Sequence, residues 1–361
     1  MKPSGAHGSC SRRVEDDARH VTGDEMKEDG MLLAGDIGGT KTDLAIFSQQ
    51  AGPNSPLVQG ELHSADYPSL QALVTEFLKK VQMPVERACF DVAGPVIDGR
   101  VKITNLPWVM DEASLAKDLN LKSVRLINDL EAVARAIPLL RPSDVNTLNA
   151  GQPVPKGAIA VVAPGTGLGE SFLTWDGSKY VSHSSEGGHA DFAPTDERQI
   201  GLLRYMLARF DHVGIERVCS GIGIPNIYEY LRDIEHMPES PQITQLIAAS
   251  KDRTAAIVES AVNPENPSKL CAATVDTFIS ILASEAANLA LKVLATGGVY
   301  LAGGIPLHML RVLQGPGFME SFERKGRFVE LMKHIPVHVI LTRAALVGAA
   351  AYGLESFREG S

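Results

Sequence analysis

The sequence lacks the features that mark disulfide scaffolds, zinc sites and membrane proteins. It has only four cysteines in 361 residues, with no C-x-x-C pair, which is typical of a reduced, cytoplasmic protein. No stretch resembles a transmembrane span, because the longest apolar helical one, LASEAANLALKVLA, carries a glutamate and a lysine. The net charge of −9 argues against a nucleic-acid partner, although it does not exclude one local phosphate site.

Length and composition indicate a globular protein with two domains. The chain exceeds the size at which a single hydrophobic core usually stops growing, and 44% of its residues are apolar and 21% charged. Residues 1–30 carry charges of both signs and match neither a secretory signal nor a transit peptide, so they are predicted to be a disordered N-terminal extension. Translation from Met31 would still give a complete domain.

Two segments about 130 residues apart share the pattern of an apolar strand, a glycine-rich turn and a second strand. They are MLLAGDIGGTKTDLAIFS and GAIAVVAPGTGLGESFLTW, and their similarity indicates an internal duplication. Gly38 and Gly39 are expected to supply the positive φ of a tight hairpin turn. A third glycine turn ends the strand in GGVYLAGGIP, where Pro306 suits the first turn of a helix. This mixture predicts α/β layers with ligands at the carboxyl ends of the strands.

The glycine turns are candidates for binding phosphate. They match neither the P-loop, because Thr40 separates Gly39 from Lys41, nor the dinucleotide fingerprint, because Glu170 stands where a glycine is needed. Backbone N–H groups in a glycine turn nevertheless form an anion-binding concavity. Asp36, at the end of the first strand, is placed to hold a hydrated Mg²⁺, whereas Lys41 could face either phosphate or solvent. The candidate nucleotide-binding residues are Gly35, Asp36, Ile37, Gly38, Gly39, Thr40, Gly165, Thr166, Gly167, Gly303 and Gly304.

Taken in order, several motifs resemble those of one family. They are GDIGGTKTDLAIF, LINDLEAVARAI, PGTGLGES, EGGHADFAPTDERQIGLLRYM, ERVCSGIGIPNIYEYL and LAGGIP. The set resembles the bacterial-type glucokinase family of the actin, Hsp70 and sugar-kinase superfamily. The resemblance implies a two-lobed actin-like ATPase (ribonuclease H-like) α/β fold, with a small domain of residues 31–139 plus 342–361 and a large domain of residues 140–341 flanking a cleft.

The family resemblance also implies an activity and its partners. The activity is transfer of the γ-phosphoryl group of MgATP to the 6-hydroxyl of D-glucose by a cytoplasmic homodimer that binds neither nucleic acid nor membrane. The Cys-rich zinc motif of the related sugar kinases and repressors is absent, and no helix-turn-helix precedes Met31, which disfavours a repressor.

The resemblance assigns the sugar contacts as well. Sugar hydroxyls both donate and accept hydrogen bonds, and carboxylates, amides and imidazole can bind them. The glycines between Glu186 and His189 disfavour a helix, so a loop with both side chains in the cleft is expected. Trp108 is expected to pack in the interior. The candidate substrate-binding residues are Asn105, Asn128, Asp129, Glu186, His189 and Glu216; without the family resemblance, Glu186, His189 and Glu216 could be ordinary surface groups.

A predicted strand runs directly into a predicted helix at Asn128–Asp129. Asn128 as N-cap and Glu131 three residues later form a pair similar to a capping box. Asp129 then takes the first helical position, where the helix dipole favours its ionised form. An ionised carboxylate can accept the proton of the attacking alcohol, so Asp129 is the predicted general base. Asn128 could cap the helix or contact the sugar.

Two other functions fit the same residues. The first is a kinase for another hexose or amino sugar, such as fructose, mannose or an N-acetylated sugar. The second is a sugar- or nucleotide-responsive binding protein without catalysis. Both glycine turns and the carboxylates Asp36 and Asp129 are intact, which counts against the second. Glycine turns do not distinguish ATP from ADP or polyphosphate as donor.

Overall fold

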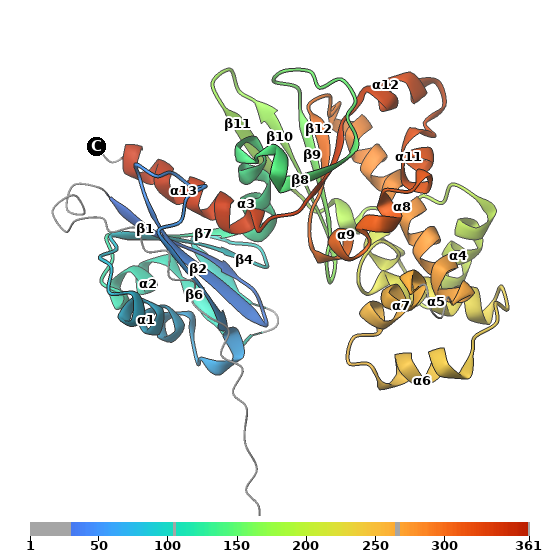
Figure 1. Cartoon of the computed structure of the whole chain (residues 1–361), viewed down its shortest axis with the longest axis horizontal. Coiled ribbons are helices and arrows are strands. Elements are labelled where there is room, and N and C mark those ends of the chain that lie inside the picture. Colours follow the sequence, from blue (N-terminus) through green and yellow to red (C-terminus); the bar gives the residue numbers. More distant parts are fainter. Residues whose placement is uncertain (1–29, 104–105, 264–267, 360–361) are drawn as a thin grey trace, which may run out of the picture. The chain divides into compact units, whose positions relative to one another are not determined.

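The computed structural model describes residues 30–103, 106–263 and 268–359, which form two compact units (Figure 1). One unit comprises residues up to Asn128 together with those from Ala349 onward, and the other runs from Asp129 to Gly348. The predicted disordered extension, apart from Gly30, lies outside the described residues. The domain limits predicted from the sequence, after residue 139 and before residue 342, stay a prediction.

The first unit is built on one five-stranded sheet in the order β3-β2-β1-β4-β7. Its central strand β1 runs antiparallel to β2 and parallel to β4, which is parallel to β7. The strands are β1 (Met31–Ile37), β2 (Lys41–Ser48), β3 (Val58–His63), β4 (Arg87–Val92) and β7 (Ser123–Asn128), with a separate ribbon of β5 (Arg100–Lys102) and β6 (Val109–Asp111). Helices α1 (Leu70–Val81) and α2 (Glu112–Asp118) lie on one side of the sheet, and α13 (Ala344–Glu359) lies on the other (Figure 1).

Helix α1 follows from its sequence pattern. Its apolar residues recur at helical spacing, and Leu70, Leu73, Val74 and Phe77 are buried against the sheet. The Oγ of Ser69 accepts a hydrogen bond from the backbone N–H three residues later, which caps the helix. Trp108 is also in this core with 2% of its surface exposed, so its predicted packing role is confirmed.

The second unit repeats the strand arrangement of the first. Its six-stranded sheet has the order β11-β10-β9-β12-β13-β8, and β9 runs antiparallel to β10 and parallel to β12. The five strands β11-β10-β9-β12-β13 therefore match β3-β2-β1-β4-β7 in order and direction, which confirms the predicted duplication. The strands are β8 (Val145–Asn149), β9 (Ile159–Pro164), β10 (Leu168–Trp175), β11 (Tyr180–Ser185), β12 (Gly298–Leu301) and β13 (Val337–Ile340).

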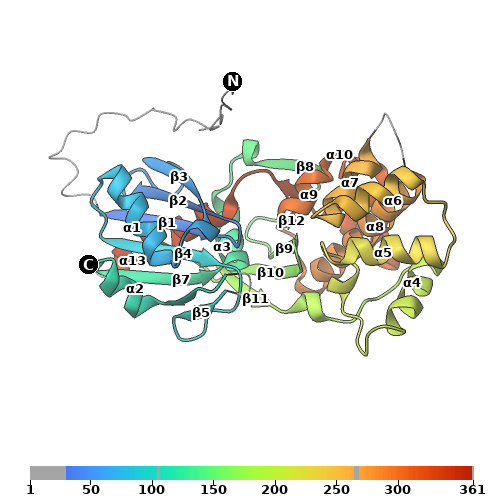
Figure 2. The same cartoon turned by 90° about the horizontal axis from the view of Figure 1, so that it is seen from below.

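Helices cover both faces of this second sheet. Helix α3 (Asp129–Ala136) packs on one face, and the long helix α8 (Lys269–Val293) packs on the other (Figure 1). Helices α5 (Gly223–Asp233) and α7 (Arg253–Val262) pack against α8, and α6 (Pro241–Ala249) packs against α7 (Figure 2). The remaining helices are α4 (Glu197–Leu207), α9 (Gly304–His308), α10 (Leu310–Leu313), α11 (Pro316–Glu323) and α12 (Val329–His334).

Helix α8 is longer than the sequence predicts. It has 25 residues with a mean hydropathy of 1.4, so by length and composition it could cross a membrane, contrary to the expectation that no segment resembles a span. Within the unit, however, 78% of its apolar window is buried. Such burial is typical of the core helix of a globular unit, which needs the same apolar composition as a membrane helix.

Helices α13 and α3 approach so closely that only glycine fits between them. A Cβ added to Gly348 would lie 1.7 Å from the carbonyl oxygen of Ala132. We expect Gly348→Ala to lower the free energy of unfolding by about 1–3 kcal/mol, because the helices must separate. Chemical denaturation measures the loss. Gly317→Ala is the matched control, since no atom lies within 4 Å of its added Cβ, and an equal loss in both variants would contradict the prediction.

Candidate active site

The predicted site residues are divided between the two units. The first unit holds residues 35–40 and Asn128, and the second holds Asp129 and the remaining described candidates. Asn105 lies outside the described residues.

In the first unit, a three-residue glycine turn connects β1 and β2. Gly38 donates a backbone hydrogen bond to the Lys41 carbonyl (3.0 Å), and Ser64 binds the carbonyls of Gly38 (2.7 Å) and Thr40 (3.0 Å). A Cβ on Gly38 would lie 2.6 Å from the Lys41 carbonyl oxygen, whereas its φ is not positive. The predicted positive φ is therefore wrong for Gly38. Glycine is needed there for close backbone approach.

Asp36 lies in a row of carboxylates at this end of the sheet. The strand register pairs it with Asp43 of β2 and with Asp91 of β4, and paired residues point to the same face. Mg²⁺ prefers oxygen ligands such as carboxylates, and the ion usually keeps several of its bound waters. Within the part of the chain that the structure describes, however, no group of three or more Asp, Glu, His or Cys side chains is arranged to hold a metal ion, so the binding of a hydrated Mg²⁺ by Asp36 stays a prediction. Lys41, which could have faced phosphate, forms an ion pair with Glu61 (2.7 Å).

Strand β7 passes into helix α3 without a loop, as the sequence predicts. The Asn128 amide donates to the Gly94 carbonyl (3.1 Å). The Asp129 carboxylate accepts the next backbone N–H (2.8 Å), and Glu131 accepts two hydrogen bonds from Arg135. Asp129 is thus the first residue of α3, at the positive end of its dipole. The capping pair of Asn128 and Glu131 stays a prediction.

In the second unit, three glycine segments meet. The turn Gly165–Gly167 joins β9 and β10, and Gly221 donates a hydrogen bond to the Gly165 carbonyl (2.8 Å). Gly303, with φ of +89°, lies so close that an added Cβ would be 3.0 Å from the Pro164 carbonyl oxygen. No described atom lies within 4 Å of a Cβ added at Gly165. That open space suits the approach of a phosphate group to backbone N–H groups.

The segment predicted to be a loop contains one short 3₁₀ turn, η5 (Gly187–His189), with Glu186 directly before it and His189 at its end. The two glycines are compatible with this tight turn, although they disfavour an α-helix. A 3₁₀ helix has three residues per turn, so residues three apart lie on the same side. His189 Nδ1 is 3.8 Å from Glu186 Oε2, and the side chains are 68% and 88% exposed. Both are available to a ligand.

Glu216 lies directly against the second glycine turn. It belongs to the 3₁₀ turn η6 (Ile215–Arg217), and its Oε2 accepts the N–H of Leu168 (3.1 Å). A Cβ on Gly167 would lie 2.2 Å from this oxygen, and a Cβ on Gly188 would lie 2.1 Å from the Leu168 carbonyl oxygen. Both η5 and η6 therefore pack directly against the beginning of β10. These contacts are possible because Gly167 and Gly188 have no side chains.

Helix α3 reaches the same end of β10. A Cβ on Gly169 would lie 3.0 Å from a methyl group of Leu130, the residue that follows Asp129. The second unit thus brings Asp129, the turn Gly165–Gly167, the η5 residues and Glu216 to the beginning of one strand. Sequence reasoning missed Leu168 and Gly221, although the SGIG segment was a signal for another glycine turn.

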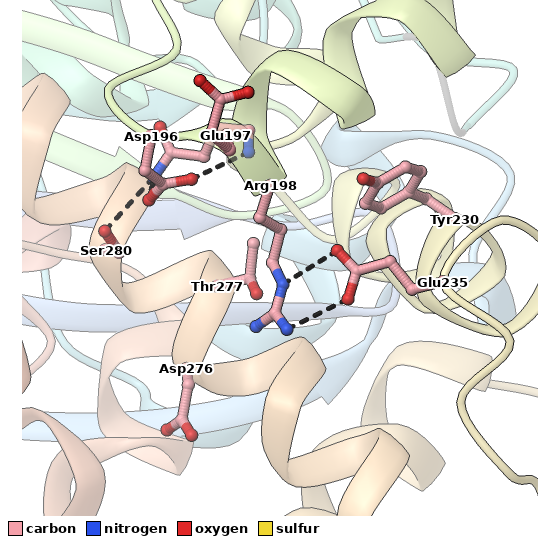
Figure 3. Close-up of a pocket in the computed structure, with 9 residues that line it drawn as sticks. Asp196, Glu197, Arg198, Tyr230, Glu235, Asp276, Thr277 and Ser280 are labelled. Atoms are coloured by element: carbon pink, nitrogen blue, oxygen red, sulfur yellow. Dashed lines mark hydrogen bonds and ion pairs between the residues drawn. The ribbon is translucent and has the colours of Figure 1, made fainter.

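A separate hollow of about 560 Å³ lies at the beginning of α4 in the second unit (Figure 3). Arg198 forms a two-bond ion pair with Glu235 there (both 3.0 Å), and Asp276 projects from α8. Its lining residues are Asp196, Glu197, Arg198, Gln199, Tyr230, Glu235, Asp276, Thr277 and Ser280. None of the predicted site residues is among them.

The duplicated α/β units with glycine turns at their strand ends define a sugar kinase of the actin-like fold, so the predicted fold class is confirmed. The chain belongs to the glucokinase family, whose model, Glucokinase, matches residues 33–356.

Two similar proteins support the family assignment, and a third supports the fold. The glucokinase of Nostoc punctiforme is 42% identical over 335 residues, covering 89% of this chain and 98% of that protein. The crystal structure of a glucokinase from an Antarctic psychrotroph matches with a TM-score of 0.78 and 31% identity, covering 90% and 99% of the two chains. A ROK family glucokinase from Streptomyces griseus, in complex with glucose and AMPPNP, matches in fold with a TM-score of 0.61 and 18% identity, covering 90% and 100%.

Glu216 and Glu186 should differ in their effect on stability. We expect Glu216→Ala to lower the free energy of unfolding by about 1–3 kcal/mol, because the N–H of Leu168 loses its acceptor. Glu186→Ala should leave stability unchanged, because its side chain is 88% exposed. Thermal unfolding without sugar measures both. Glu216→Gln, which keeps an acceptor oxygen, is the control, and equal stability of Glu216→Ala and wild type would contradict the role of this hydrogen bond.

Proposed function

We propose that the chain transfers the γ-phosphoryl group of ATP to the 6-hydroxyl of D-glucose, with Asp129 as the general base. Membership of the glucokinase family makes the chain an ATP-dependent enzyme of glucose phosphorylation. The observation that supports the assignment of residues is the convergence at the beginning of β10. There the turn Gly165–Gly167, Glu216, the η5 turn and the first turn of α3 are in contact.

The proton of the sugar hydroxyl is the first chemical problem. An alcohol is a weak nucleophile, so its proton must leave as the bond to phosphorus forms. Asp129 is the first residue of α3, where the helix dipole stabilises a negative charge. In this proposal its carboxylate accepts the proton, while the hydrogen bond from the next backbone N–H (2.8 Å) holds the side chain in place.

The second chemical problem is the negative charge of the phosphate groups, which backbone N–H groups can stabilise. Each unit carries one glycine turn at a strand end, residues 38–40 and Gly165–Gly167, and Thr40 and Thr166 add hydroxyl donors. Gly303 and Gly304 supply a third glycine segment in the second unit. Preorganised donors of this kind stabilise charge on the transferred phosphoryl group. Asp36 would hold Mg²⁺ through water, and the bound ion would supply further positive charge at the phosphates.

The sugar is held by side chains that can both donate and accept. We assign this role to Asn105, Asn128, Glu186, His189 and Glu216, together with Asp129. Glu216 has one oxygen on the N–H of Leu168, so its second oxygen is the one assigned to a sugar hydroxyl. A panel of glucose, fructose, mannose and N-acetylated sugars, with ADP formation as readout, tests the preference for glucose.

The proposal extends to the state of the protein in the cell. We propose a cytoplasmic homodimer with a small domain of residues 31–139 plus 342–361 and a large domain of residues 140–341. The thiols of Cys89, Cys219 and Cys271 are buried and form no disulfide among the described residues, which suits a reducing compartment. Light scattering of the purified chain measures the oligomeric state, and a monomer would contradict this part.

Removing the proposed base should strongly reduce turnover and leave sugar binding detectable. We expect Asp129→Ala to lower kcat at least ~10²-fold, because no carboxylate remains to accept the proton. Calorimetry should still detect glucose binding. Asp211→Ala, which removes an exposed acid of the same unit, is the control and should keep wild-type turnover. Near-normal turnover of Asp129→Ala would refute the assignment, and glucose binding by wild type without ADP formation would favour a non-catalytic binding protein.

A further inference from the structure

A second carboxyl group lies beneath the sugar-binding turn. Glu170 follows the turn Gly165–Gly167 in β10, and only 1% of its surface is exposed. The strand register pairs it with Ser185, immediately before Glu186. A Cβ on Gly187 would lie 2.0 Å from Glu170 Oε2, so this oxygen fills the space that a side chain at Gly187 would need. The turn that carries Glu186 and His189 therefore rests on the Glu170 carboxyl.

Glu170 interacts with a second buried carboxyl, that of Glu285 of α8, which is 4% exposed. Asn288 donates to Glu285 Oε2 (3.0 Å), and Lys292 Nζ lies 3.8 Å from Oε1. Each carboxylate oxygen of Glu285 therefore faces a hydrogen-bond donor or a cation. Glu170 Oε1, in contrast, has no hydrogen-bond partner among the described residues. A proton shared by the two carboxyls therefore belongs on Glu170, where it can be donated to Glu285.

We propose that Glu170 is a positioning residue for the sugar site, which holds the Glu186–His189 turn in place by filling the space at Gly187, with the Glu285 carboxyl as its buried neighbour. The inference rests on the proposed function of Glu186 and His189 as sugar contacts. Glu170 acts through the turn and touches neither substrate. It should therefore control the KM for glucose and leave the KM for ATP unchanged.

The protonation state of Glu170 decides whether this support works. Burial and the neighbouring Glu285 raise the pKa of Glu170 to about 7. The titratable and charged groups around it are Glu285 and Lys292 from α8 and the buried thiol of Cys219, while Lys325 contacts Ser284 and Asn288 of α8. Below this pKa the group is neutral and pairs with Glu285. Above it two buried carboxylates repel each other, and the repulsion displaces the Gly187 turn.

The first test compares the pH dependence of KM for glucose in wild type and Glu170→Gln. The wild-type KM should rise ~10-fold between about pH 6 and pH 8, because the fraction of neutral Glu170 falls by that factor. Gln has the same shape, is never charged and still donates to Glu285, so the KM of this variant should not rise. Asp276→Asn, which removes another acid of α8 with a raised pKa, is the control and should follow wild type. Identical profiles of wild type and Glu170→Gln would overturn the proposal.

The second test uses the space at Gly187. Glu170→Ala and Gly187→Ala should each raise the KM for glucose at least ~10-fold, with the KM for ATP within about twofold of wild type. The double variant should be no worse than Glu170→Ala alone, because the added methyl group then occupies the vacated space. If the KM for glucose of the double variant rose by the product of the two single-variant factors, the proposal would be overturned. A wild type without glucose turnover would instead refute the proposed function, whereas active wild type with unchanged KM in every variant would refute this inference alone.

Discussion

The site in the second unit depends on one constraint, the absence of side chains around the beginning of β10. Three oxygen atoms occupy positions where a side chain would place its Cβ. Glu216 Oε2 lies at the Cβ position of Gly167, Glu170 Oε2 at that of Gly187, and the Leu168 carbonyl oxygen at that of Gly188. Each contact would require a shift of the backbone or of a buried or half-buried carboxyl if a Cβ were present. These three glycines therefore fix the positions of η5 and η6, and with them the proposed sugar contacts Glu186, His189 and Glu216.

The duplication explains why the glycine turns recur and why their neighbours differ. Both units place a three-residue turn after the central strand, between residues 37 and 41 and between Pro164 and Leu168. The residue before the strand end is Asp36 in β1 but Ala163 in β9. The first unit thus keeps a carboxylate suited to a cation at this position. The second unit lacks it there and instead brings Glu216 to its turn from a separate segment.

The sequence predicted what local patterns determine and missed what depends on packing between distant segments. Strand patterns and glycine turns predicted both hairpins, and the residues around Asn128–Asp129 predicted the junction of a strand with a helix. The hydrogen bond between Glu216 and Leu168 joins segments that are far apart in the chain, so no local sequence pattern predicts it. The positive φ expected at Gly38 was wrong for a related reason. Glycine can serve either an unusual φ or a close approach, and only the fold distinguishes them.

Two carboxyl groups near the beginning of β10 show how surroundings assign chemical roles. Asp129 begins a helix and accepts a backbone N–H, so donors and the dipole stabilise its charge. Glu170 is buried beside another carboxyl, and burial stabilises its neutral form. A charged Asp129 is suited to accept a proton, and a neutral Glu170 is suited to fill space and donate a hydrogen bond. Both groups are carboxylic acids, so the difference comes from burial and neighbouring donors, which a sequence pattern does not specify.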